Sequence, residues 1–136
     1  MAEPRPILDG LFETDGAGAR LLAGRCTACA ALHFPATPLC PYCGASADVA
    51  RVGPRGTLRL FTSVRTAPPG YRGPVPYGFG VVELDGTGLC VLGRLVEADT
   101  RRLHPGQAVR LVIEPLYVDD EGHPVLSWLF AAEGSS

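Results

Sequence analysis

Residues 26–44 contain two closely spaced cysteine pairs, Cys26-Thr27-Ala28-Cys29 and Cys40-Pro41-Tyr42-Cys43, with ten residues between the pairs. Two residues between cysteines let both sulfur atoms of a tight turn point at one ion, and two such turns complete a tetrahedron of thiolates. A site of this kind has no open coordination position, so we expect a structural role. The predicted metal ligands are Cys26, Cys29, Cys40 and Cys43.

Zinc is the metal that this donor set favours, because zinc accepts four tetrahedral sulfur ligands and has no redox chemistry. A rubredoxin-like iron site and a metal-free ribbon are the alternatives. His33 lies between the two pairs and could replace a cysteine, although a hydrogen-bonded or surface histidine is the commoner case. Gly44 follows the second pair and eases the backbone turn, whereas Ala30 follows the first and predicts a looser turn.

The composition favours a folded chain built mainly of strands. Hydrophobic residues make up 46% of the 136 residues, and 17 Gly and 13 Pro leave little room for long helices. No apolar run reaches the roughly 18 residues that cross a bilayer, and the first six residues do not resemble a signal peptide. We therefore expect a cytoplasmic protein without a membrane segment, in which paired cysteines indicate metal or redox chemistry rather than disulfides.

Beyond Pro54 the sequence alternates between strand-like segments and turn signals. The five expected strands are residues 57–65, 77–84, 89–96, 108–117 and 125–131. A hairpin turn is indicated at residues 85–88, which read Asp-Gly-Thr-Gly. Five strands are the number in a Greek-key barrel of the oligonucleotide/oligosaccharide-binding type (OB-fold). The near closure of such a barrel limits its exposed strand edges.

These observations predict an all-β protein in three parts. Residues 1–19 form an arm or short helix, since their apolar residues between Ile7 and Phe12 are spaced like about one and a half turns of amphipathic helix. Residues 20–53 form the zinc ribbon, and residues 54–133 form the OB-fold. We expect Cys90 to be a small buried hydrophobe in its apolar strand.

Apolar and polar residues alternate in the first expected barrel strand, residues 57–65, and this pattern predicts that the strand has two different faces. Leu58, Leu60 and Val64 would lie on the apolar face. Arg59, Phe61 and Arg65 would lie on the other face, where they could meet an anionic ligand. In the alternative interpretation, Phe61 belongs to the core and the two arginines pair with Glu83 or Asp85 across the strands.

The formal net charge of −2 is unevenly distributed along the chain. Residues 20–72 carry seven Arg against one acid, whereas the segments on either side are acidic. A basic middle segment is typical of a face that binds an anion, although a solvated face without a ligand is equally consistent with it.

Several further stretches make the chain similar to a known family when they are taken together with the cysteine pairs. They are Phe34-Pro35, Gly56-Thr57-Leu58, Phe61-Thr62, the segment Pro76-Tyr77-Gly78-Phe79-Gly80-Val81-Val82-Glu83-Leu84-Asp85-Gly86, and Leu103-His104-Pro105-Gly106-Gln107-Ala108-Val109. The resemblance is to two-part proteins in which a rubredoxin-like zinc ribbon precedes an OB-fold, long known as a domain of unknown function and associated with acyl-CoA. It covers about residues 20–131. Ala30 and residues 35–38, where the family tends to place an arginine soon after the proline, depart from its pattern.

The resemblance implies a non-catalytic accessory subunit in a hetero-oligomer with a thiolase-fold catalytic subunit. The reaction would form or break a carbon–carbon bond of an acyl-CoA, by thiolysis, condensation or a retro-aldol step. This chain would dock beside the partner's active site, carry structural Zn²⁺ and help to hold the coenzyme A portion of the substrate. The candidate coenzyme A contacts are Arg59, Phe61, Arg65, Tyr71, Arg72 and Tyr77, which offer arginines for phosphates and aromatic faces for adenine.

Two other functions compete with this interpretation. Zinc ribbons and OB-folds also bind single-stranded nucleic acids, but the acidic carboxyl-terminal half argues against that function here. A purely architectural adaptor is the second alternative. Catalysis by this chain alone is disfavoured, because the three histidines fall in expected loops and a closed tetrathiolate site cannot activate water.

Overall fold

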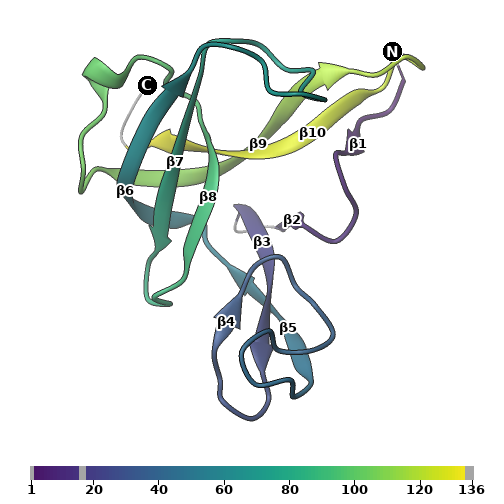
Figure 1. The fold of residues 1–136 in the computed structure, drawn as a ribbon. Helices are drawn as coiled ribbons and strands as arrows, with labels where there is room; N and C mark the ends of the chain where they lie inside the picture. Colours follow the sequence, from purple (N-terminus) through teal and green to yellow (C-terminus); the bar gives the residue numbers. More distant parts are fainter. Residues whose placement is uncertain (1, 16–17, 134–136) are drawn as a thin grey trace.

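A computed structural model describes residues 2–15 and 18–133 of the chain (Figure 1). Among these residues the only helical element is one 3-10 turn, and all other regular elements are β-strands. The elements are β1 (Arg5–Pro6), β2 (Phe12–Asp15), β3 (Gly18–Cys26), β4 (Leu32–His33), β5 (Ala47–Val52), β6 (Arg55–Val64), β7 (Tyr77–Leu84), β8 (Cys90–Leu95), η1 (Thr100–Arg102), β9 (Ala108–Val118) and β10 (Pro124–Ala132).

The first sheet is built around β3, which pairs antiparallel with β2, β4 and β5. Residues 1–19 were expected to form an arm or a short helix, and the helix near Ile7 to Phe12 is wrong: Phe12 begins β2 and pairs with Leu21, while β1, nearer the N-terminus, pairs parallel to β10. Gly10 has a φ of 83°, a left-handed conformation that interrupts any helix between the two strands. Of the apolar arm residues, Leu11 is buried, whereas Ile7 and Leu8 remain exposed.

Strands β6 to β10 form a closed barrel, as predicted. Along the sheet the order is β10-β8-β7-β6-β9, and a further β9–β10 pairing closes it. All of these pairings are antiparallel except that of β8 with β10. This is a five-stranded OB-like barrel, and the expected hairpin turn joins β7 to β8.

A bulge in β6 overturns the predicted assignment of its two faces. Leu58 pairs with Val82 but Leu60 pairs with Val81, so Arg59 is an extra residue in this strand. Beyond the bulge the side chains change sides: Leu58 is 0% exposed, whereas Leu60 is 67% exposed. A single inserted residue has this effect because side chains alternate with a period of two.

The burial predicted for Cys90 is also wrong, because this side chain is exposed at the start of β8. Its neighbour Val91 is 3% exposed and supplies the inward side chain at this end of the strand. In a strand with one face on the core, alternate residues face outward even where the sequence is continuously apolar.

The ribbon and the barrel share one hydrophobic core. Leu21, Ala23 and Val52 of the ribbon sheet belong to the same buried cluster as Leu58 and Phe130 of the barrel. Figure 1 shows the ribbon strands extending from one end of the barrel.

An aromatic contact joins the two parts beside that core. The ring of Phe34, just after β4, meets the ring of Trp128 in β10 edge to face, with centroids 5.6 Å apart. Through this contact, the ribbon that carries the cysteine turns packs against the barrel.

Within residues 2–15 and 18–133, no helix has the length and hydrophobicity that a membrane-spanning segment requires.

Candidate functional site

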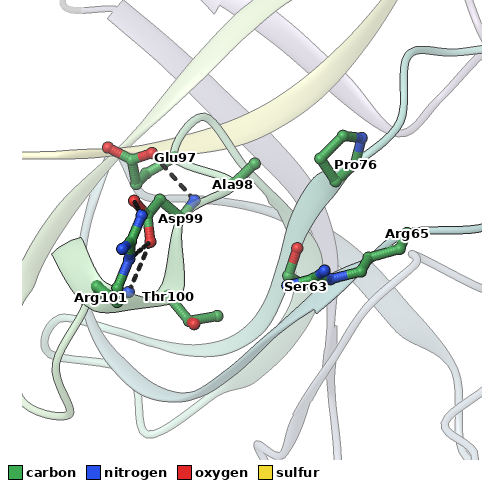
Figure 2. A pocket seen from close by; sticks show the side chains of 8 residues that line it. All are labelled: Ser63, Arg65, Pro76, Glu97, Ala98, Asp99, Thr100 and Arg101. Atoms are coloured by element: carbon green, nitrogen blue, oxygen red, sulfur yellow. Dashed lines mark hydrogen bonds and ion pairs between the residues drawn. The ribbon is translucent and has the colours of Figure 1, made fainter.

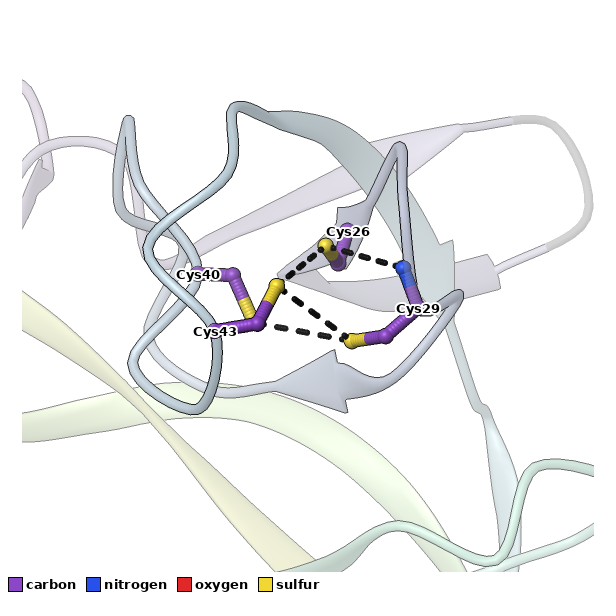
Figure 3. A group of neighbouring side chains, drawn as sticks. All are labelled: Cys26, Cys29, Cys40 and Cys43. Atoms are coloured by element: carbon purple, nitrogen blue, oxygen red, sulfur yellow. Dashed lines mark hydrogen bonds between the residues drawn. The ribbon is translucent and has the colours of Figure 1, made fainter.

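The four cysteines of the two pairs converge in the ribbon, where Cys26 ends β3 (Figure 3). Their Sγ atoms all lie within 4.8 Å of one another. The Sγ–Sγ distances are 3.3 Å for Cys26–Cys43, 3.9 Å for Cys29–Cys40 and 3.8 Å for Cys29–Cys43. A tetrahedral ion with sulfur bonds of about 2.3 Å requires separations of about 3.8 Å, so the donor set fits zinc.

Both cysteine pairs lie on the same type of backbone turn. The Ala30 N–H donates to the Cys26 carbonyl at 3.1 Å, and the Gly44 N–H donates to the Cys40 carbonyl at 2.9 Å. The first turn is therefore formed like the second, and the looser turn expected from Ala30 is not observed. Its backbone is instead strained, since Ala30 has a φ of 63° in the left-handed region where Gly44 has 80°.

Backbone amides prepare the first turn to carry a thiolate. The N–H groups of Ala28 and Cys29 both donate to Cys26 Sγ at 3.3 Å. The Cys29 amide, followed by the Ala28 amide, lowers the pKa of the Cys26 thiol to about 6. At Cys43 the amide of Ala45 has the same lowering effect, but the adjacent sulfurs, Cys26 first, outweigh it and raise the pKa to about 11. Four sulfur atoms this close resist ionising together unless a cation neutralises them.

His33 is not part of the sulfur cluster. It is 5% exposed in β4, and the Thr37 backbone N–H donates to its Nε2 atom at 3.2 Å. Gly24 makes room for the ring, because a Cβ at that position would lie 2.2 Å from His33 Nε2. Of the alternatives considered for this residue, the hydrogen-bonded role is the one observed.

The six candidate coenzyme A contacts do not share one surface. Arg59 Nη2 lies 2.9 Å from Glu83 Oε1, which is the cross-strand pairing considered as an alternative. Phe61 is partly buried and packs against the core. Because the bulge falls at Arg59, this residue does not share one simple alternation with Phe61 and Arg65.

The other candidates lie near the opposite end of β6. Tyr71 and Tyr77 pack ring against ring with centroids 4.7 Å apart. Arg72 lies over the Tyr117 ring, 4.6 Å from its centroid, and its Nη2 atom contacts Asp120 at 3.1 Å. This end of the barrel therefore has aromatic surface, but the guanidinium of Arg72 already has an acidic partner.

Arg65 contributes to a hollow of about 820 Å³ between the end of β6 and the loop around η1 (Figure 2). Figure 2 shows Arg65 and Arg101 on opposite sides of this hollow. The Arg101 side chain, and then its backbone N–H, hydrogen-bond to Asp99 and lower the pKa of that carboxyl to about 2. Glu97 is a second acid in the lining. Two arginines and two carboxylates balance here, so the hollow has no excess positive charge.

The basic middle segment is largely neutralised by the acidic ends of the sequence. Four of its seven arginines contact acids that lie outside residues 20–72. The pairs are Arg51–Glu13, Arg55–Glu133, Arg59–Glu83 and Arg72–Asp120. This pairing removes much of the positive surface on which the nucleic-acid alternative depended.

Sequence reasoning missed two residues that line a second, apolar groove. Arg94 in β8 and Trp128 in β10 border a volume of about 490 Å³, together with Tyr71, Tyr77 and the N-terminal arm. Arg94 stands in an otherwise apolar strand and Trp128 is the one tryptophan of the chain, but neither fact places the residues together.

Comparison with known proteins agrees with this architecture. Residues 15–49 match the family model "ChsH2, rubredoxin-like zinc ribbon domain", and residues 49–114 match "ChsH2, C-terminal OB-fold domain". A solved structure of the Ltp2-ChsH2(DUF35) aldolase contains a chain that is similar with a TM-score of 0.64 and 26% identity, covering 83% of this chain and 84% of that one.

Two archaeal relatives are each described as a DUF35 domain-containing scaffold protein. The protein from Pyrococcus furiosus is 30% identical over 108 residues, which are 79% of this chain and 78% of the relative. The protein from Methanocaldococcus jannaschii is 25% identical over 105 residues, which are 75% of this chain and 74% of the relative. With its cysteine cluster and closed barrel, the chain therefore belongs to the family that joins the ChsH2 rubredoxin-like zinc ribbon to the ChsH2 OB-fold domain.

Proposed function

We propose that this protein is a non-catalytic accessory subunit of a thiolase-like enzyme that acts on acyl-CoA, forming or breaking a carbon–carbon bond. The observation that carries the proposal is the similarity, over most of both chains, to a chain of the Ltp2-ChsH2(DUF35) aldolase. The scaffold description of the two archaeal relatives points in the same direction. In this proposal the partner supplies the catalytic groups.

The cysteine cluster supports a structural role for this chain. Four sulfur ligands would fill the tetrahedral coordination of Zn²⁺ and leave no position for a substrate or a reactive water. Bound zinc would fix the two turns relative to β3 and, through the shared core, relative to the barrel. The ribbon would then present a rigid surface to a partner.

The outer face of the barrel offers an apolar surface for that partner. An apolar row crosses three adjacent strands of this face. It consists of Leu60, Val81 and Leu92, because Val81 pairs with both leucines. Leu60 is 67% exposed and Leu92 is 59% exposed. Neighbouring apolar side chains of this size on a sheet face are typical of protein interfaces. We infer that the catalytic subunit docks on this row.

Docking is tested by co-purification from the native cell with Leu60→Asp and Leu92→Asp variants. The expected result is that the wild-type chain retains a thiolase-fold subunit and both variants lose it, because a charge on the row opposes desolvation. Val49→Asp is the matched control, since Val49 is 57% exposed on the ribbon. Retention of the partner by both row variants would contradict this docking surface, and isolation of the wild type without a thiolase-fold subunit would contradict the function.

Coenzyme A binding is assigned to the barrel end that holds Arg65, Tyr71, Arg72 and Tyr77. Tyr71 and Tyr77 pack ring against ring there, Arg72 lies over the Tyr117 ring, and Arg65 directly follows Val64, which pairs with Tyr77. Arginines and aromatic rings would suit the phosphates and the adenine of coenzyme A. Phe61 is a weaker candidate because it packs against the core. Arg59 is weaker than Arg72 because its partner Glu83 is 38% exposed, whereas Asp120, the partner of Arg72, is 94% exposed and forms a weaker ion pair.

Steady-state kinetics of the reconstituted complex test this assignment. Arg65→Gln and Arg72→Gln should each raise the KM for acyl-CoA several-fold, while the complex still assembles. Arg110→Gln is the control, because Arg110 is an exposed arginine of β9 outside this cluster. An unchanged KM in both variants would favour the purely architectural adaptor.

A further inference from the structure

The apolar groove contains polar groups whose hydrogen bonds are not satisfied. Among the described residues, Arg94 Nε, Arg94 Nη1 and Trp128 Nε1 are buried and have no hydrogen-bond partner. Buried donors are almost always paired, because leaving one unpaired costs about 1–3 kcal/mol and more when the group is charged. Both residues line the groove, so these three donor nitrogens are candidates to bind an acceptor that enters it.

The walls of the groove are suited to the hydrocarbon part of a ligand. They come from the N-terminal arm, from the loop before β7 and from strands β7 to β10, and they include Ile7, Tyr71, Tyr77 and Leu116. The Tyr77 ring also lies 5.7 Å from the Arg94 guanidinium carbon. An apolar pocket with a few convergent polar groups is the usual form of a small-molecule site.

The charge in the groove restricts the head group of a ligand. Among the described residues of the lining, Arg94 is the one that carries a charge. Burial raises the pKa of Tyr71, although the positive charge of Arg94 partly opposes the shift, so the phenol stays neutral at pH 7. One positive charge is balanced by one negative charge, whereas the second charge of a phosphate monoester would remain uncompensated in this apolar setting.

We propose that this groove binds a monocarboxylic acid with an apolar body. Its carboxylate would accept hydrogen bonds from Arg94 and Trp128, and its hydrocarbon part would pack against the tyrosines and the N-terminal arm. This site shares Tyr71 and Tyr77 with the proposed coenzyme A contacts. It goes beyond the accessory function proposed above and requires neither a catalytic partner nor coenzyme A. It is therefore tested on the isolated full-length chain.

The fluorescence of Trp128 provides a direct measurement, since the chain contains one Trp. Octanoate and 1-octanol are the first probes, because they share a chain length and differ in the head group. Octanoate should change the emission saturably and bind at least about tenfold more tightly than the alcohol, since hydrogen bonds to charged groups are the stronger ones. Octyl phosphate should bind more weakly than octanoate.

Variants of Arg94 separate the contribution of its charge from that of the hydrophobic fit. Arg94→Gln should lose at least about tenfold in octanoate affinity and bind octanoate and octanol alike, while Arg94→Lys should retain part of the preference. Arg110→Gln is the control and should bind like the wild type. Arg94→Lys keeps the test informative if the Gln variant does not fold.

Three results would overturn the proposal. The first is equal affinity of the wild type for octanoate and octanol, or no saturable binding of either. The second is full octanoate affinity in Arg94→Lys or Arg94→Gln. The third is tighter binding of octyl phosphate, or of a peptide carboxyl terminus without an apolar tail, which would assign the groove to another class of ligand.

Discussion

At the residue scale, the two cysteine turns differ in how easily their last residue adopts the required backbone conformation. Gly44 and Ala30 occupy matched positions, and both have positive φ values. Glycine reaches this region without steric cost, whereas an L-residue with a Cβ pays about 1–2 kcal/mol. The departure from the family pattern at Ala30 therefore leaves the shape of the turn unchanged and lowers its stability.

Exchanging the two residue types tests this interpretation. Ala30→Gly should raise the free energy of unfolding by about 0.5–1 kcal/mol, because the relief of strain exceeds the added entropy of the unfolded chain. Gly44→Ala is the matched control and should lower it by a similar amount, since a Cβ there would meet no neighbouring atom within 4 Å. Denaturant unfolding of the zinc-loaded protein measures both. A destabilised Ala30→Gly variant would show that the turn is not strained.

The cysteines also allow a paired test of metal binding. Cys40→Ser should abolish stoichiometric zinc binding, measured by elemental analysis of the purified protein, because it removes one of four converging sulfur atoms. Cys90→Ser should retain zinc, because Cys90 is an exposed cysteine outside the cluster. A Cys40→Ser protein with its full zinc content would contradict the assigned ligand set.

At the element scale, the bulge in β6 determines that the side chain of Leu58, and not that of Leu60, packs inside the barrel. It also moves Arg59 to a position from which the guanidinium meets Glu83. Exposed Leu60, directly beyond the bulge, is thereby placed on the outer face that we propose for docking. The alternation visible in the sequence cannot reveal this change, because a bulge depends on hydrogen bonds with a neighbouring strand.

Alanine substitutions measure the consequence for stability. Leu58→Ala should lower the free energy of unfolding by about 2–5 kcal/mol, since it leaves a cavity among residues that are fully buried. Leu60→Ala should change it by no more than about 0.5 kcal/mol, because this side chain is 67% exposed. Urea unfolding compares the two. Similar losses would mean that both leucines lie in the core and that the bulge is absent.

At the scale of the whole molecule, the metal centre and the barrel are coupled through one core. Leu21, Ala23 and Val52 connect the ribbon to the barrel interior, and Phe34 packs on Trp128 at the same junction. A change in the ribbon should therefore reach the barrel.

Removal of the metal tests this coupling. Chelation should lower the thermal midpoint of the whole chain and shift the emission of Trp128 to longer wavelength, because the contact with Phe34 depends on an ordered ribbon. Phe34→Leu, with zinc still bound, should give the fluorescence change without the loss of metal. Unchanged Trp128 emission after complete zinc removal would show that the ribbon and the barrel behave independently.

The sequence by itself determined the local chemistry and the order of the elements. The spacing of Cys26, Cys29, Cys40 and Cys43 predicted the sulfur cluster, because two tight turns already position their own sulfur atoms. Five barrel strands and the hairpin at residues 85–88 were predicted from alternation and turn residues, which act over a few neighbours.

Only the tertiary structure decided which distant side chains meet. The strands of the N-terminal arm, the bulge at Arg59 and the exposure of Cys90 all depend on partners far along the chain. The same holds for the pairing of basic and acidic segments and for the placement of Arg94 and Trp128 in one groove. The physical reason is that register, bulges and burial are set by long-range strand pairing and packing, which override the local pattern of a single segment.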